Sequence, residues 1–222
     1  LAKKIVAGTV GVDIVAGPSE VLVIADDAAT PEFVAADLLA QAEHDPTASA
    51  VLATPARELA QRVRVEVERQ RRELPRAKIA GASIDRFGAA FVVADLDAAL
   101  ALANRLAPEH LELHVREPFA LLGGVRNAGA VFLGEYTPEA IGDYVAGPNH
   151  VLPTAGTARF ASALSVDHFL KRTSVIHYSQ AAFRREARDV LNLAQVEGLD
   201  AHARSVSLRL EPRRKRKGVE GE

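Results

Sequence analysis

The chain has 222 residues, of which 48% are hydrophobic and 25% are charged, a composition typical of a globular protein with a sizeable core. Its 27 Lys and Arg against 29 Asp and Glu give a formal net charge of −2, which argues against nucleic acid as the main partner. Cysteine is absent, which excludes disulfides, thiolate catalysis and Cys-ligated zinc, so any metal site must use His, Asp, Glu or amide oxygen.

The sequence opens with LAKKIVAGTVGVDIVAG, residues 1–17, and contains no methionine. This start is typical of the middle of a domain, and we expect a truncated chain; processing or the omission of a few residues is the alternative. No apolar run reaches the roughly 18 residues of a membrane span, and no signal-peptide pattern opens the chain. We therefore expect a cytoplasmic protein with no membrane partner.

Apolar runs alternate with helical patterns along residues 21–143. Strands are predicted at residues 21–26, 48–55, 88–95, 111–115 and 128–134. Helices are predicted at residues 31–44, 56–74, 96–107, 117–124 and 139–143. The first and last of these helices begin with a Thr-Pro-Glu sequence, in which Thr caps the helix and Pro takes its first position. The alternation predicts an α/β fold with a mostly parallel sheet.

The pattern changes after residue 147. Residues 147–163 are rich in Gly, Pro and Thr, which predicts a loop or linker, and helices are predicted beyond it at residues 165–171, 181–196 and 201–210. We therefore expect an α/β domain at residues 21–163 and a helical module at residues 164–222. Five consecutive basic residues, 213–217, are interpreted as a solvated tail, with nucleic-acid binding or targeting as the alternative.

Two short segments of the α/β region carry candidate chemical groups. Gln41 and His44 lie three residues apart at the end of a helix and share a face, so they could be two metal ligands; polar surface is the alternative. Glu109 and His110 are adjacent at a helix-to-strand junction and point in different directions. They suit two separate proton transfers, and a charged loop is the alternative.

Two later segments also combine His with acidic groups. Residues 142–150 present Asp143 and His150 on a turn after a helix, where binding and catalytic residues often lie; an Asp/Asn turn without chemistry is the alternative. Glu197 ends one helix and His202 lies in the first turn of the next, where the helix dipole favours a neutral, metal-binding imidazole. A packed or capping histidine is the alternative for His202.

Five segments have the order and approximate spacing found in one enzyme family: GPSEVLVIAD, DLLAQAEHDP, LAPEHLEL, GDYVAGPNHVLPT and EGLDAHARSVSLRL. The chain resembles the C-terminal half of histidinol dehydrogenase. The resemblance implies a Rossmann-like, mostly parallel sheet domain followed by a C-terminal helical dimerisation module. Residues 1–20 would be a remnant of the N-terminal, cofactor-side domain, and the rest of that domain would be missing.

The resemblance also implies an activity, the oxidation of L-histidinol to L-histidine through histidinaldehyde, with two NAD⁺ and one zinc ion per site. It implies a homodimer with shared active sites. The implied zinc ligands are Gln41, His44, Asp143 and His202. Glu109 would activate the water that hydrates the aldehyde, and His110 would act as the base in both oxidations.

The same resemblance implies how the substrate is bound. The implied contacts to histidinol are Ser19, Gln41, His44, His110, Asp143, Glu197 and His202. Of these, Glu197 and His202 would come from the partner subunit. His150 is a further candidate for the carboxyl end of the substrate. The resemblance also implies that the NAD⁺ contacts lie upstream of Leu1. Separately, no G-x-G-x-x-G follows a strand in this sequence.

Two other functions stay open for this sequence. A catalytically silent fragment would keep only zinc binding or dimer contacts, and the upstream reading frame of the gene would distinguish it from the enzyme. A generic NAD-linked α/β enzyme with accidentally placed histidines would not be expected to carry five ordered motifs. The donor set would also accept Mn²⁺ or Co²⁺.

Overall fold

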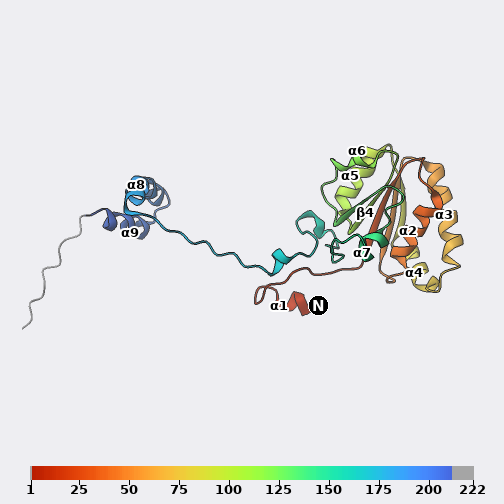
Figure 1. Ribbon diagram of the computed structural model, residues 1–222, viewed down its shortest axis with the longest axis horizontal. Coiled ribbons are helices and arrows are strands. Elements are labelled where there is room, and N and C mark those ends of the chain that lie inside the picture. Colours follow the sequence, from red (N-terminus) through yellow and green to blue (C-terminus); the bar gives the residue numbers. More distant parts are fainter. Residues whose placement is uncertain (1, 212–222) are drawn as a thin grey trace, which may run out of the picture. The chain divides into compact units, whose positions relative to one another are not determined.

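The computed structural model describes residues 2–211 (Figure 1). The chain divides into two compact units, Leu1–Leu170 and Lys171–Glu222. The segment just past Ala163 belongs to the first unit because the Leu164 N–H donates a hydrogen bond to the Val151 carbonyl at 2.9 Å. The predicted basic tail, residues 213–217, lies outside the described residues.

The first unit is built on a five-stranded sheet. Its strands are β1 (Glu20–Ala25), β2 (Ser49–Thr54), β3 (Gly88–Val92), β4 (His110–His114) and β5 (Ala130–Leu133). They lie in the order β3-β2-β1-β4-β5, and every neighbouring pair is parallel. The α/β fold with a mostly parallel sheet is thus confirmed. The strand order reverses between β1 and β4.

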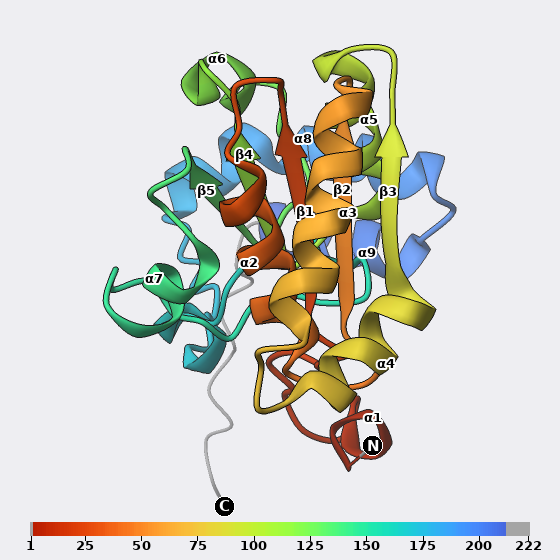
Figure 2. The same cartoon turned by 90° about the vertical axis from the view of Figure 1, so that its right-hand side faces the viewer.

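Helices cover both faces of the sheet. The helices of the first unit are α1 (Ala2–Val6), α2 (Pro31–Ala42), α3 (Arg57–Arg71), α4 (Ala77–Phe87), α5 (Leu96–Leu106), α6 (Pro118–Leu122) and α7 (Glu139–Tyr144). Figure 2 shows α2, α3 and α4 in front of the strands and α5 behind them. Short 3-10 helices follow at Thr157–Arg159 and Val166–Phe169. No helix among residues 2–211 is long and apolar enough to cross a membrane.

Two apolar clusters fill the space between the sheet and its helices. Val21 and Val23 of β1 pack beneath α2 and α3, whereas Leu22 and Ile24 pack on the opposite face against α5. Side chains alternate between the two faces of a strand, so a strand covered on both sides reads as a continuous apolar run. This explains why the EVLVIA sequence of β1 is apolar from its second residue onwards.

The strand β4 differs from β1 in its chemistry. Leu111 and Leu113 pack in the cluster around α5, while His110, Glu112 and His114 alternate with them and are buried too. One face of β4 is therefore apolar and the other carries three buried ionisable side chains. Burial of such groups requires partners, because a charge removed from water is costly when it is alone.

The second unit is a pair of helices, α8 (Gln180–Val196) and α9 (Asp200–Leu210). Ser179 caps α8 by accepting a hydrogen bond from the Ala182 N–H at 3.2 Å. Gly198 joins the helices at a positive φ of 68°, a conformation that favours glycine. Ala187, Ala194 and Val206 are the buried residues of the pair.

Two predicted elements differ from the structure. Helix α4 was not predicted, because Pro75 and Gly81 interrupt its helical pattern in the sequence; Gly81 lies where an added Cβ would be 3.1 Å from Arg71 Nη1. The helix predicted at residues 165–171 is wrong beyond a single 3-10 turn, Val166–Phe169. Phe169 is 74% exposed, so this segment has no apolar surface against which a longer helix could be stabilised.

Helix α7 packs closely on β5 at a glycine. A Cβ added to Gly142 would lie 2.5 Å from Cε1 and 2.8 Å from Cζ of Phe132. The Phe132 ring also lies beside His110, with ring centroids 5.9 Å apart. Because Gly142 has no side chain, α7 can lie close to Phe132 of β5, and Asp143 is thereby held close to the sheet.

We expect Gly142→Ala to lower the free energy of unfolding by about 1–3 kcal/mol, because the added methyl group forces α7 away from Phe132. Urea denaturation measures the change. The control is Gly123→Ala, at a position where an added Cβ meets nothing within 4 Å, and it should change stability by less than about 0.5 kcal/mol. An equal loss from Gly142→Ala in a Phe132→Ala background would contradict the steric cause.

Candidate active site

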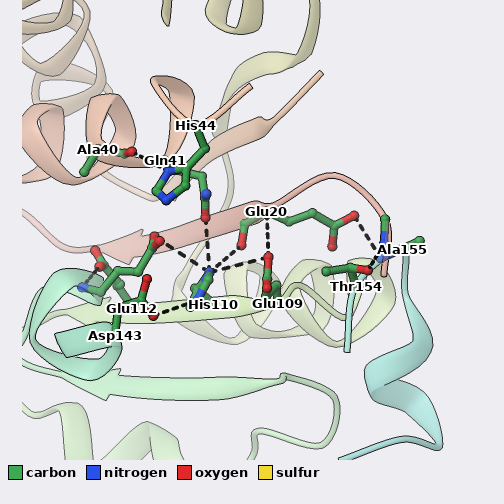
Figure 3. A network of polar contacts seen from close by, with 12 residues as sticks. Glu20, Ala40, Gln41, His44, Glu109, His110, Glu112, Asp143, Thr154 and Ala155 are labelled. Atoms are coloured by element: carbon green, nitrogen blue, oxygen red, sulfur yellow. Dashed lines mark hydrogen bonds and ion pairs between the residues drawn. The ribbon is translucent and has the colours of Figure 1, made fainter. Parts of the chain in front are cut away.

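Polar side chains from separate parts of the first unit meet at the amino ends of β1 and β4. The parallel register places Val21 opposite His110, so Glu20 and Glu109, which precede them, are neighbours. Helix α2 runs back along the sheet and brings Gln41 and His44 to the same edge (Figure 3). Asp143 reaches it from α7. These residues form the candidate active site.

His110 is oriented through its Nδ1 atom. This nitrogen lies 3.2 Å from the Glu20 carbonyl oxygen, so it carries the proton and donates it. Nε2 is then the atom with a free lone pair; it has no hydrogen-bond partner among the described residues and lies 4.0 Å from Asp143 Oδ1. Burial lowers the pKa of His110. A neutral imidazole with a free Nε2 can accept a proton.

Glu109 is held by the same backbone segment. The Glu20 N–H donates a hydrogen bond to Glu109 Oε2 at 3.1 Å. Burial raises the pKa of Glu109 to about 7, with the Glu20 and Asp143 carboxylates adding to the effect. A carboxyl group with a pKa near neutrality is suited to general acid–base catalysis.

Gln41 is fully buried beside His110, at the end of α2. Its Oε1 faces His110 Nδ1 at 3.1 Å in Figure 3. With oxygen and nitrogen exchanged, Nε2 donates to the Glu20 carbonyl at 3.2 Å and to Glu139 Oε2 at 3.1 Å, which satisfies the amide better. Nε2 then also lies 3.1 Å from His110 Nδ1, and no hydrogen bond joins these two atoms while Nδ1 carries the proton that it donates to the Glu20 carbonyl. This orientation frees Oε1 from those neighbours and makes it available to a cation.

Three further side chains form a group suited to a metal ion. His44, Glu139 and Asp143 each offer a ligand atom, and these atoms lie within 4.8 Å of one another. The His44 Nδ1 donates to the Ala40 carbonyl at 2.9 Å, which leaves Nε2 as the ligand atom. Nitrogen and oxygen donors of this kind, without thiolate, suit an accessible catalytic zinc site.

The site concentrates negative charge. Burial raises the pKa of Glu139 to about 9, and the carboxylates of Glu112, Asp143 and Glu109 raise it further. A carboxyl group shifted in this way binds a proton at neutral pH because a further anion is unfavourable there. A divalent cation at the same place would relieve the repulsion, which agrees with the donor set.

The remaining predicted residues lie in different places. Ser19 directly precedes β1 and is half-buried. His150 is exposed and lines a cavity of about 170 Å³ together with Asp143 and Phe132. Glu197 and His202 are exposed residues of the second unit, at the end of α8 and the start of α9, so no contact with the candidate active site is described for them.

Sequence reasoning missed two residues of the site. Glu20 acts through its backbone, which no side-chain pattern reveals. Glu139 was interpreted only as the acidic residue of a Thr-Pro-Glu helix start, yet it is 4% exposed and reaches Gln41. The signal available in the sequence was its spacing of one helical turn from Asp143, which places both carboxylates on one face of α7.

Comparisons with known proteins all point to one family. The family model of histidinol dehydrogenase matches residues 1–210. A histidinol dehydrogenase of a Synechococcus species is 61% identical over 94% of this chain and 48% of its own length, and that of Geobacter sulfurreducens is 56% identical over 94% and 49%. The crystal structure of histidinol dehydrogenase from Elizabethkingia anophelis matches with a TM-score of 0.88 and 40% identity, covering 94% of this chain and 48% of that one. The chain spans about half the length of these relatives.

Stability should depend on pH through Glu139. Its pKa is raised from 4.5 to about 9 on folding, so the stability it contributes is present below about pH 4.5 and is lost as the pH rises towards 9. In metal-free protein, Glu139→Gln should therefore increase the free energy of unfolding at pH 8 by at least about 1 kcal/mol, with a smaller gain at pH 5. Urea denaturation at the two pH values measures this. A gain that does not grow between pH 5 and pH 8 would contradict the raised pKa.

Proposed function

Because the chain belongs to the histidinol dehydrogenase family, we propose that it carries the zinc-binding and proton-transferring part of an enzyme that oxidises L-histidinol to L-histidine. The observation that carries this proposal is the meeting of Gln41, His44 and Asp143 with Glu109 and His110 at one edge of the sheet. Potential metal ligands thus lie beside two proton acceptors of different chemistry. This combination can provide both the binding of an alcohol substrate and the removal of its proton.

Zinc would be held by Gln41, His44 and Asp143, and we propose that His202 of a partner subunit completes the set. When bound, zinc orients and polarises the substrate, since it has no redox chemistry of its own. Support comes from the free Oε1 of Gln41, the directed imidazole of His44 and the concentrated negative charge. The substrate would also contact Ser19, and Glu197 of a partner subunit. His150 lies beside a small cavity that Asp143 also lines, which leaves it a candidate for the carboxyl end of the substrate.

The first oxidation turns an alcohol into an aldehyde. His110 Nε2 accepts the hydroxyl proton as the carbinol carbon loses its hydride; NAD⁺, when bound, would supply the hydride acceptor. The neutral state of His110, favoured by its burial, fits the role of the base. Its Nδ1–H stays bonded to the Glu20 carbonyl, so the imidazolium that forms keeps its orientation.

The second oxidation starts from the hydrated aldehyde. As Glu109 removes a proton from the water that adds to the aldehyde carbon, the His110 imidazolium returns its proton to the aldehyde oxygen. His110 is then neutral again and can accept a hydroxyl proton of the hydrate as the carbon loses its second hydride. The hydrogen bond from the Glu20 N–H keeps Glu109 in place. The two proton acceptors therefore divide the work, with His110 acting in both steps and Glu109 mainly in the step that needs water.

Residues 2–211 supply no proposed contact to NAD⁺. Sheets of this type commonly bind dinucleotides at the carboxyl ends of their strands, here at the ends of β1 and β4. Asp26 and Asp27 follow β1, and neither strand is followed by a glycine-rich fingerprint. Asp26 Oδ2 accepts a hydrogen bond from the Arg116 N–H at 2.9 Å, so Asp26 links the turn after β1 to the turn after β4. We propose a homodimer with shared sites and a cytoplasmic location, in keeping with a biosynthetic enzyme.

The metal assignment can be tested by Co²⁺ titration, followed by visible absorption and by isothermal calorimetry with Zn²⁺. His44→Ala and Asp143→Ala should each weaken binding by about tenfold or more, because a direct ligand matters at least as much as the groups that orient it. His168→Ala removes an exposed histidine outside the site and should leave binding unchanged. Wild-type affinity in both ligand variants would overturn the assignment.

The division between the two proton acceptors can be tested in the active enzyme. Glu109→Gln should slow oxidation of histidinaldehyde by about 10²–10⁴ and affect oxidation of histidinol less, whereas His110→Ala should slow both. Since Glu109 must be deprotonated and its pKa is about 7, the rate of the aldehyde step should rise with pH through about 7, and Glu109→Gln should abolish this rise. Equal and small losses in both steps would argue against the division.

A further inference from the structure

A second group of ionisable side chains lies deeper along the same face of β4. Glu112 and His114 have no exposed side-chain surface, and Asp37 of α2 has 12%. His114 Nε2 lies 3.3 Å from Glu112 Oε2 and 3.4 Å from Asp37 Oδ2. These three residues, which we call the lower cluster, take no part in the proposed chemistry, although burying them is expensive.

The lower cluster and the candidate active site draw their residues from the same helix and strand, α2 and β4. Asp37 lies one helical turn before Gln41 on α2, and Glu112 lies two residues after His110 on β4, so each shares a face with its counterpart. On α7, Glu139 lies one turn before Asp143. The lower cluster reaches that helix too, because Glu112 Oε1 accepts a hydrogen bond from the Glu139 N–H at 2.9 Å.

That hydrogen bond replaces a missing helix cap. The N-terminal N–H groups of a helix need acceptors, which a Ser, Thr, Asp or Asn at the N-cap usually supplies. The N-cap of α7 is Pro138, which makes no side-chain cap. Helix α7 has six residues, too few to be stable through its own hydrogen bonds. Its start therefore depends on an acceptor from a neighbouring element, and Glu112 provides one.

We propose that Glu112 is a positioning residue that caps α7 from β4 and thereby holds Asp143 at the distance from His110 that the metal site needs. The part of this proposal that concerns the metal rests on the function proposed above. His114 and Asp37 contribute by occupying the space beside the second carboxylate oxygen, which fixes the direction of the first. One side chain thus links the strand that carries the base to the helix that carries a ligand.

The charges of the lower cluster are consistent with this role. Burial and the neighbouring Glu112 carboxylate raise the pKa of Asp37 to about 7, while His114 lowers it. A protonated or histidine-paired Asp37 avoids two adjacent anions in the core. The lower cluster can then stay buried while Glu112 Oε1 accepts the Glu139 N–H.

The test compares Glu112→Leu with Glu112→Gln in metal-free protein by amide hydrogen exchange. The monitored amides are Val145 and Ala146, which both donate to the Ile141 carbonyl within the last turn of α7. Glu112→Leu removes the acceptor and should speed their exchange by about tenfold or more. Glu112→Gln keeps an acceptor oxygen and should stay within about threefold of the wild type.

A matched control removes the same kind of bond elsewhere. Thr54 is fully buried and its Oγ1 accepts the Ala56 N–H at 3.0 Å, just before α3. Thr54→Val should therefore leave the exchange of Val145 and Ala146 unchanged. Co²⁺ titration adds the second measurement: affinity should fall about tenfold in Glu112→Leu, remain within about threefold in Glu112→Gln and be unaffected in Thr54→Val.

Each failure has a separate meaning. Unchanged exchange in Glu112→Leu overturns the cap, whatever the metal does. Faster exchange with unchanged Co²⁺ affinity, while His44→Ala loses affinity, overturns the positioning of the metal site. Absence of Co²⁺ binding by the wild type counts against the proposed function, while the exchange data still decide the cap. A second Co²⁺ per chain that disappears in Glu112→Leu would make the lower cluster a metal site and overturn the proposal.

Should Glu112→Leu fail to fold, a pair of variants at the donor decides the question. Glu139→Ala and Glu139→Pro both remove the side chain, and only the proline also removes the N–H. Proline is compatible with the first position of a helix, so the comparison isolates the hydrogen bond to Glu112. Exchange of Val145 and Ala146 about tenfold faster in Glu139→Pro than in Glu139→Ala supports the cap, and equal exchange overturns it.

Discussion

The parallel register between β1 and β4 is the constraint on which the site depends. It sets Val21 opposite His110 and so brings the backbone of Glu20 between the two proton acceptors. The N–H of this one residue binds Glu109, and its carbonyl accepts from His110. Main-chain groups inside a sheet have little freedom to move, so both side chains inherit the rigidity of the strand pair. A shift of one residue would turn every side chain of β4 to the other face.

The site also shows how a fold can tolerate several carboxylates in a small volume. Glu109 and Glu139 are buried and their pKa values are raised, so protons occupy part of the site when no cation is present. The hydrogen bonds that orient them come from backbone N–H groups and the Gln41 amide rather than from Lys or Arg. Among residues 2–211, no Lys or Arg is hydrogen-bonded or ion-paired to Glu109 or Glu139, so the negative charge remains available to a metal ion and to a cationic substrate.

Much of the architecture could be predicted from the sequence because it rests on local patterns. The apolar run of β1 and the Thr-Pro start of α2 are strong signals, and the alternation of strands with helices implies a parallel sheet. Helix α4 was missed because its interior glycine is accommodated by packing near Arg71, which no local pattern shows. Site segments were found because His and acidic residues lie close in sequence there. The roles of Glu20, Glu112 and Glu139 arise from contacts between strands and helices that are distant in sequence, so only the folded chain shows them.

The amino-edge position of the site has a consequence for engineering the protein. The turns that follow β1, β2 and β4 lie at the opposite edge of the sheet and carry none of the proposed ligands or bases. Surface loops generally accept insertions when their backbone hydrogen bonds are few. The Ala56 N–H donates to Thr54 Oγ1 and the Arg116 N–H donates to Asp26 Oδ2, so these turns suit labels on exposed side chains and not insertions. Such labels are separated from the reactive groups by the full length of a strand. Side chains at the carboxyl edge of the sheet can therefore be changed independently of the site at its amino edge.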